Sequence, residues 1–252
     1  MRSLFLTLIA ISAAVQLISG LMLEAHASVV TGEFIYQKQG LSKTAFSYRV
    51  EQDTFQGVPA WRVSWQGQGM NADHLIRRSD LRPLYTSREN HRNGQRIEIR
   101  YSTLIDTPTL YRRFEGGKTV ELNIWHTNLY DLGALPQLLA SRLTTGGDPN
   151  IKFSAINYND GKVYELKARR GELRSVVAGE GSIDCVEYTV SLDSWMSAII
   201  SPVRLLISGQ QSLESNLVAY KGPGLDGVES FWSLLLVASS SRLAMAERAP
   251  AN

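Results

Sequence analysis

The sequence is poor in cysteine: its 252 residues include one, Cys185. An intramolecular disulfide is therefore excluded, and a chain of this length can bury enough apolar surface to fold without one. Cys185 lies in the strand-like run of residues 184–188. We expect it to be a small buried side chain, because unpaired cysteines usually occupy apolar sites.

The sequence also lacks the short motifs that mark several classes of enzyme. It contains no Gly-x-Ser-x-Gly motif of the α/β-hydrolases and no glycine-rich nucleotide loop. The histidines beyond the N-terminal segment, His74, His91 and His126, have no second His or Cys at metal-ligand spacing. We therefore predict no metal, no cofactor and no catalytic residue. We expect His74 on the solvent-facing side of a strand and His91 in a polar turn.

Neither sign of charge dominates, since 26 Lys and Arg stand against 24 Asp and Glu, for a net charge of +2. A chain this close to neutral has no strong electrostatic attraction to nucleic acid or to anionic membranes. Nucleic acid is therefore not an expected partner.

The N-terminal segment has the three parts of a secretory signal peptide. A positive start, Met1-Arg2, precedes an apolar run over residues 4–18, and Ala25-His26-Ala27 is a small-x-small cleavage site. The run is shorter than the roughly 20 apolar residues that a membrane-spanning helix needs. We predict that residues 1–27 are removed and that the mature chain is periplasmic, with no membrane span after cleavage.

Alternation of apolar and polar residues dominates the rest of the chain. Trp61, Val63 and Trp65, for example, alternate with Arg62 and Ser64. The same period of two recurs over residues 46–51, 97–101, 120–124, 164–168 and 186–192, with glycine-containing turns at 93–94, 116–117 and 160–161. Such runs are typical of antiparallel strands with one apolar and one wet face. The sequence therefore predicts a mostly β fold, an antiparallel curved sheet or half-barrel.

One stretch, residues 129–143, has helical periodicity instead. Leu132, Leu135, Leu139 and Leu143 recur every three or four positions and would share one helix face. Asp131 can cap the start, residues 146–147 are glycines that can end the helix, and Pro136 must lie in its first turn. We predict one short amphipathic helix packed against the sheet.

The chain divides on this reading into a signal peptide (1–27), a single β-rich domain (28–224) and a C-terminal tail (225–252). The tail contains an apolar run over residues 231–238 and ends in a polar segment that we expect to be disordered. The apolar run is either a buried last strand or helix, or a tail that meets a membrane or a partner protein.

Aromatic and arginine side chains are the candidates for a binding site. If the sheet encloses a hollow, its aromatic residues can contact an apolar or sugar ligand, and arginines can bind an anionic group. The alternative is an ordinary core and a solvated sheet face. The candidates are Trp61, Trp65, Tyr101 and Trp125, with Arg82, Arg100 and Arg112 from the region 77–113, in which basic residues outnumber acidic ones.

The order of several short segments resembles domain-of-unknown-function family 3108, a family of exported bacterial proteins. The segments are Gly32-Glu33-Phe34-x-Tyr36, Leu81-Arg82-Pro83-Leu84-Tyr85, Asp131-Leu132-x-Ala134-Leu135, Gly161-Lys162-Val163-Tyr164-Glu165-Leu166 and Pro202-Val203-Arg204. The sequence departs from the family pattern at Val177, where the family usually has proline, and after Gly224. The resemblance implies an exported β-rich fold and supplies no catalytic residues.

These observations favour a non-enzymatic periplasmic protein that binds or carries an amphiphilic lipid or a glycan. A second hypothesis is a structural or assembly factor of the cell envelope, which acts through protein contacts that include residues 231–238. A third is a hydrolase without a recognisable motif.

Overall fold

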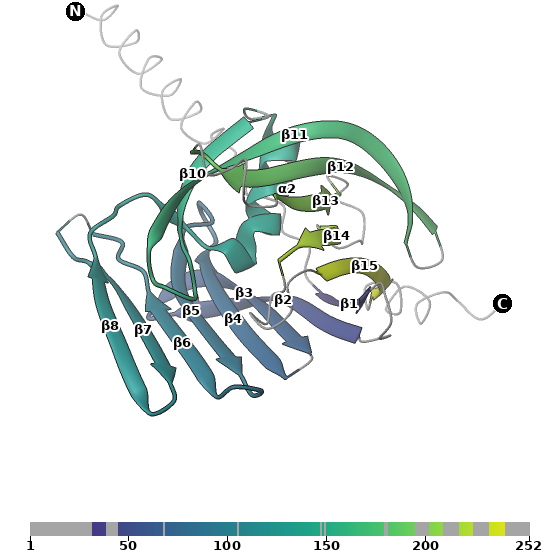
Figure 1. The fold of residues 1–252 in the computed structure, drawn as a ribbon. Helices are drawn as coiled ribbons and strands as arrows, with labels where there is room; N and C mark the ends of the chain where they lie inside the picture. The colour runs from purple at the N-terminus through teal and green to yellow at the C-terminus, as the bar shows by residue number, and fades with distance from the viewer. Residues whose placement is uncertain are drawn as a thin grey trace, which may run out of the picture.

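The computed structural model describes residues 32–38, 45–67, 69–104, 106–146, 148, 150–178, 181–194, 202–208, 217–223 and 232–239 (Figure 1). The predicted signal peptide and the end of the predicted tail lie outside these residues. Within them, no helix is long and apolar enough to cross a membrane.

The described residues form one 15-stranded sheet, and the mostly β fold that the sequence predicted is confirmed. Its first eight strands are β1 (Gly32–Lys38), β2 (Ala45–Phe55), β3 (Val58–Gly67), β4 (Met70–Arg77), β5 (Pro83–Asn90), β6 (Gln95–Arg100), β7 (Thr109–Glu115) and β8 (Lys118–Ile124). The others are β9 (Leu129–Tyr130), β10 (Asn150–Ile156), β11 (Val163–Ala178), β12 (Gly181–Leu192), β13 (Val203–Ile207), β14 (Leu217–Gly222) and β15 (Trp232–Ser239).

The first described strand, β1, lies in the middle of this sheet, and the strands that follow fill its two halves in turn. Strands β1 to β8 run outward as an antiparallel meander to one edge. The chain then crosses to the other edge at β9, which pairs with β10 in parallel, and returns through β11 to β15. The last strand, β15, lies antiparallel to β1, so that Phe34 faces Ser239 across the ladder.

The apolar run of the predicted tail therefore supplies a strand in the centre of the sheet. β15 is hydrogen-bonded to β1 on one side and to β14 on the other. Leu234 and Leu236 are buried. Of the two interpretations of this run, the buried last strand agrees with the structure.

Alternation places the large apolar side chains of most strands on the concave face. Trp61, Val63 and Trp65 of β3 are all buried, as the period of two predicted. The pattern fails at the edge strand β8, where Val120 and Leu122 are each 37% exposed. An edge strand has a neighbour on one side only, so the next strand cannot cover its side chains.

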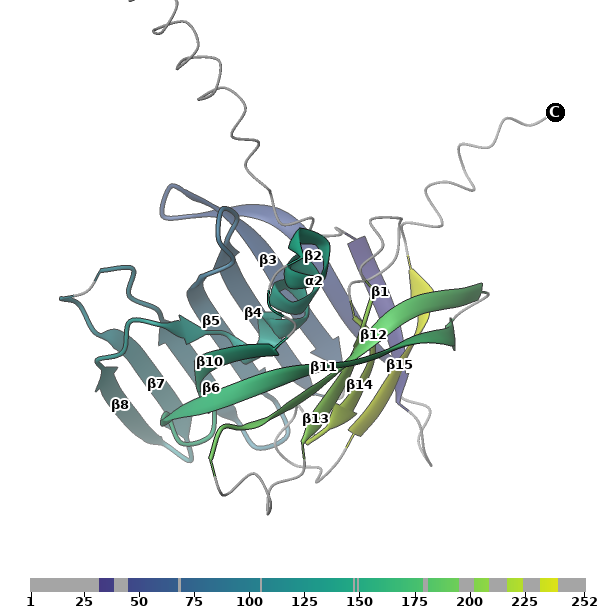
Figure 2. The same ribbon diagram turned by 90° about the horizontal axis from the view of Figure 1, so that it is seen from above.

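The sheet curls around a short helical segment (Figures 1 and 2). This segment consists of a 3-10 turn, η1 (Leu132–Ala134), and an α-helix, α2 (Leu135–Thr145). The predicted signals act as expected: the Asp131 carboxylate accepts a hydrogen bond from the Gly133 N–H, and Gly146 ends the helix in the left-handed conformation. Leu135 and Leu139 are buried, and the amide of Gln137 donates to the hydroxyl of buried Tyr48.

Side chains, rather than a strand ladder, join the two halves on the open side. The turn between β10 and β11 lies against β7, where the Tyr111 hydroxyl donates to the carbonyl of Tyr158 at 2.6 Å. Arg113 donates to the carbonyl of Asn159 in the same turn. A Cβ on Gly161 would lie 2.7–2.8 Å from Leu122 and Tyr111, so the turn needs glycine for this close approach.

Candidate functional site

A cavity of about 340 Å³ lies between the helical segment and the concave face of the sheet. Its volume falls at the lower end of the range of roughly 300–1,000 Å³ that is typical of small-molecule sites. Strands β3 to β5 line one side, and strands β11 to β14 line the other. Leu132, Gly133, Leu135 and Pro136 of the helical segment also line it.

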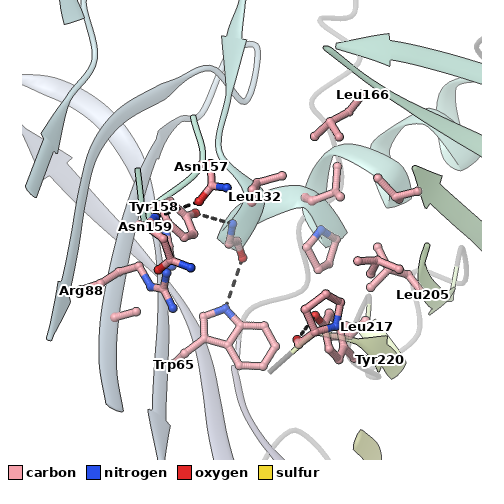
Figure 3. Close-up of a pocket in the computed structure, with 18 of the residues that line it drawn as sticks. Trp65, Arg88, Leu132, Asn157, Tyr158, Asn159, Leu166, Leu205, Leu217 and Tyr220 are labelled. Atoms are coloured by element: carbon pink, nitrogen blue, oxygen red, sulfur yellow. Dashed lines mark hydrogen bonds between the residues drawn. The ribbon is translucent and has the colours of Figure 1, made fainter. Parts of the chain in front are cut away.

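The two sides of the cavity differ in polarity. Figure 3 shows Arg88, Asn157, Tyr158 and Asn159 gathered on one side. Figure 3 shows Leu166, Leu205 and Leu217 on the opposite side, and the lining also includes Val190 of β12 and Val203 of β13. Such a lining can hold a molecule with one polar and one apolar end.

Among the described residues that line the cavity, Arg88 is the only lysine or arginine. It lies on β5 directly opposite the small residue Ala72 of β4, which leaves room for its long side chain on the concave face. The guanidinium carbon is 4.3 Å from the centre of the Tyr158 ring, within the range of a cation–π contact. One guanidinium nitrogen lies 3.5 Å from the sulfur of Met70.

Behind this polar side lies a buried cluster centred on the carboxylate of Asp131. His74 Nδ1 is 3.0 Å from the carboxylate, and the hydroxyls of Thr86 and Tyr158 both donate to it. The N–H of Gly133 donates to Asp131 Oδ1 at 2.8 Å and to the Tyr158 hydroxyl at 2.9 Å. The cluster therefore ties the helical segment to β4, β5 and the β10–β11 turn.

The cluster keeps Asp131 ionised in an interior site. Burial alone would raise the pKa of this carboxyl group. The electrostatic attraction of the His74 ring and the hydrogen bonds from His74, Thr86 and Tyr158 outweigh that effect and hold the pKa at about 2. Burial, together with the charge of Asp131, raises the pKa of Tyr158 well above its usual value, so Tyr158 stays a donor.

The imidazole of His74 lies against the backbone of Gly133. A Cβ at position 133 would be 2.1 Å from His74 Cε1 and 2.2 Å from Nε2, so only glycine allows this contact. The carbonyl of Gly133 in turn accepts a hydrogen bond from the Trp65 indole at 3.2 Å. The prediction that His74 faces solvent is wrong: the residue is 1% exposed.

Among the described residues, this cluster lacks the arrangement that a hydrolase of the His–Asp type requires. The described hydrogen-bond partners of His74 are Asp131 and Thr86, and the Thr86 hydroxyl itself donates to Asp131. A serine nucleophile would need to contact the other ring nitrogen. The part of the chain that the structure describes also contains no group of three or more metal-ligating side chains. The cluster as it stands supports a structural role beside the cavity.

Comparisons with known proteins give one distant structural likeness to report and no activity. No protein-family model matches this chain, and no curated protein matches it. Among solved structures, it is similar to a β-barrel-like protein of the domain-of-unknown-function family DUF1849 from Brucella abortus. The TM-score is 0.45 at 10% identity, over 84% of this chain and 98% of that one. We draw no functional argument from so distant a likeness.

The structure gives the predicted aromatic candidates different positions. Trp65 lines the cavity. Trp61 is buried further along β3, with the Arg78 guanidinium 4.8 Å above its ring. Tyr101 belongs to the buried cluster, with its hydroxyl 3.5 Å from Asp131. Trp125 is 69% exposed just beyond β8.

The predicted arginines lie outside the cavity lining. The guanidinium of Arg82 lies 4.5 Å from the centre of the Tyr130 ring. Arg100 is exposed, and Arg112 forms an exposed ion pair with Glu121 at 2.7 Å. The arginine that does line the cavity, Arg88, belongs to the same basic region of the sequence. Arg88 follows Thr86 by two positions on β5, so the two side chains share the inward side of that strand. This alternation is the signal that could have identified Arg88.

Proposed function

We propose that this protein binds an amphiphilic ligand of the lipid type in the cavity beside α2. One observation carries the proposal: the cavity has an aliphatic side formed by β11 to β14 and a polar side formed around Arg88. A glycan is disfavoured, because sugar hydroxyls need many hydrogen-bonding groups and most of this lining is apolar.

The compartment is part of the same proposal. The N-terminal pattern of residues 1–27 supports export to the periplasm, where a carrier could take up a lipid or lipid-like molecule. Membership of family 3108 stays a prediction from short segments, and it agrees with an exported β-rich protein.

The two other hypotheses have less support. An assembly factor that docks a partner through residues 231–238 would need an accessible segment, but β15 has a strand hydrogen-bonded on each side. A hydrolase would need a nucleophile in contact with His74, and the described partners of this residue are Asp131 and Thr86.

A matched pair of substitutions tests whether the cavity holds the ligand. Val203→Trp places a large ring at the aliphatic side of the cavity, whereas Val177→Trp makes the same change at a site that is 74% exposed. We expect protein isolated from the periplasm to carry a lipid-sized adduct in native mass spectrometry. The adduct should persist in Val177→Trp and disappear in Val203→Trp.

The same pair can be tested by titration with dodecanol, which has an alkyl chain and no charge. Val203→Trp should weaken its binding at least tenfold, because the added ring occupies the space of the chain. Equal binding by both variants, or no adduct and no dodecanol binding in the wild type, would overturn the proposal. Melting temperatures of the two variants establish that both are folded.

A further inference from the structure

We propose that two copies of this chain associate through the edge strand β8, which pairs antiparallel with β8 of the second copy about a two-fold axis at Leu122. The two sheets then continue into one another across this axis. The inference is independent of the proposed function, because the described residues that line the cavity include none from β8.

The first argument is the regularity of β8 as an edge. Among the described strands β8 has one neighbour, β7, and in Figures 1 and 2 it lies at the outer margin of the sheet. It is seven residues long, contains no proline and pairs with β7 without a bulge. Proteins often protect such an edge with a proline or a bulge, because its outward backbone groups can bind another strand. The opposite edge, β9, is only two residues long.

The turn before β8 determines which backbone groups point outward. Residues 116–117 form a two-residue hairpin turn in which both glycines have positive φ, 56° and 75°. The pair that closes such a turn exchanges backbone hydrogen bonds, so Lys118 and every second residue after it are bonded to β7. The N–H and C=O groups of Thr119, Glu121 and Asn123 therefore point away from β7, where a further strand can bind them.

The side chains of β8 also leave apolar surface uncovered. Val120 and Leu122 share the inward side of the strand and have equal exposed fractions of 37%. Ile124, on the same side, is partly buried against a neighbouring apolar cluster. Trp125, the residue after β8, is mostly exposed. A second strand along this edge would cover part of all four side chains.

The sequence of β8 is self-complementary on this inward side. With the axis at Leu122, that residue lies opposite its own copy, and Val120 lies opposite Ile124 of the partner subunit. Each inward apolar side chain of the paired segment therefore meets another apolar side chain. Such cross-strand pairs are the contacts that stabilise a sheet.

The outward side matches in the same register. Glu121 lies opposite Asn123 of the partner subunit, whose amide can donate to the carboxylate. Thr119 lies opposite Trp125 of the partner subunit, and pairs of an aromatic and a β-branched residue are favourable. These matches identify a second copy of the chain as the occupant of the edge.

The neighbouring two-fold registers are poorer. An axis at Glu121 places two carboxylates directly opposite each other, which is unfavourable. An axis at Val120 places Lys118 opposite Leu122, and an axis at Asn123 places Val120 opposite His126. The axis at Leu122 is thus the register that satisfies both sides of the strand.

A matched pair of cysteine variants tests this register. Across the axis, Leu122 and its copy form a pair without hydrogen bonds between them, in which the Cα atoms are about 4.5 Å apart and a disulfide can form. Val120 has the same exposed fraction, but it would lie about 13 Å along the strands from its own copy, too far for a disulfide. After mild oxidation we expect at least fivefold more covalent dimer from Leu122→Cys than from Val120→Cys. The native Cys185 is buried and is common to both variants.

Sedimentation equilibrium of the purified protein tests the association itself. The measurement needs about 100 μM protein, because a single pair of strands is a small interface. We expect the wild type to have the mass of two chains and Leu122→Lys, which brings two like charges together at the axis, to have the mass of one. The control is Leu173→Lys, at a highly exposed position of β11, a strand with a neighbour on each side. This variant should have the mass of two chains.

Each outcome supports or overturns the inference. A wild type with the mass of one chain overturns it and leaves a strand of a different protein as the occupant of the edge. A dimer that survives Leu122→Lys, or equal crosslinking of the two cysteine variants, places the interface elsewhere and also overturns it. If melting curves show that Leu122→Lys is unfolded, the cysteine pair and the wild-type mass decide the question.

Discussion

The Nδ1 atom of His74 and the carboxylate of Asp131 lie 3.0 Å apart in the interior, although 57 positions separate the two residues along the chain. His74 belongs to β4 and Asp131 caps η1, so this contact joins the concave face of the sheet to the segment that covers it. The cavity depends on that junction, because residues of both elements line it.

Replacing the buried carboxylate should therefore destabilise the fold. Asp131→Asn removes the charge that His74, Thr86 and Tyr158 surround, and we expect the free energy of unfolding to fall by roughly 3 kcal/mol. Urea denaturation measures the change. Glu121→Gln, in an exposed pair with Arg112, is the control and should cost less than about 1 kcal/mol. Equal losses in the two variants would contradict the structural role of Asp131.

The same carboxylate predicts a dependence of stability on acid pH. Its pKa is about 2 in the folded protein and 3.8 in the unfolded chain, so the unfolded state binds the proton more tightly. The contribution of Asp131 is therefore complete above about pH 4 and is lost as the pH falls toward 2, by about 2 kcal/mol in total. Unfolding free energies of wild type and Asp131→Asn, measured from pH 6 down to pH 3, should converge as the pH falls. Parallel curves would show that Asp131 is not the titrating group.

The contact between Gly133 and His74 predicts a steric effect. Gly133→Ala would place a Cβ 2.1 Å from the His74 ring, and we expect a loss of roughly 1–3 kcal/mol from overpacking. In a His74→Ala background the ring is gone, so the same substitution should cost much less. A double-mutant cycle by thermal unfolding measures the coupling between the two substitutions. If their effects on stability were additive, the His74 ring would not be in contact with position 133.

The turn between β2 and β3 offers a local test of backbone strain. Gln56 has a φ of 51°, a conformation that asparagine adopts more readily than glutamine and that β-branched residues strongly disfavour. Gln56→Asn should therefore raise the melting temperature slightly, and Gln56→Val should lower it. The two changes at one exposed position control for each other, and the opposite order would contradict the turn geometry.

Strand pattern and helix signals were enough to predict the class of fold. The alternation at Trp61, Val63 and Trp65 identified the buried face of β3, and Asp131 and Gly146 act as the predicted caps. These features are local, because each depends on neighbours a few positions away.

The site depended on contacts that local patterns do not contain. His74 shares the inward side of β4 with Met70, Ala72 and Ile76, so its place in the alternation indicated burial. Its polarity led to the opposite prediction, because its partner Asp131 is distant in sequence. The exposed position of Trp125, just beyond the edge strand β8, was also hidden from local patterns. An edge strand has the same alternation as a central one, and the order of strands in a sheet cannot be read from a single strand.

The pairing of β1 with β15 has a consequence for how the molecule is made. The outer ladders from β1 to β8 join segments close together in sequence and can form early, while the β1–β15 pairing spans about 200 residues. The β1–β15 pairing therefore cannot form until β15 has left the ribosome. Until then the inner edge of β1 is exposed, and other unfinished chains can compete for it.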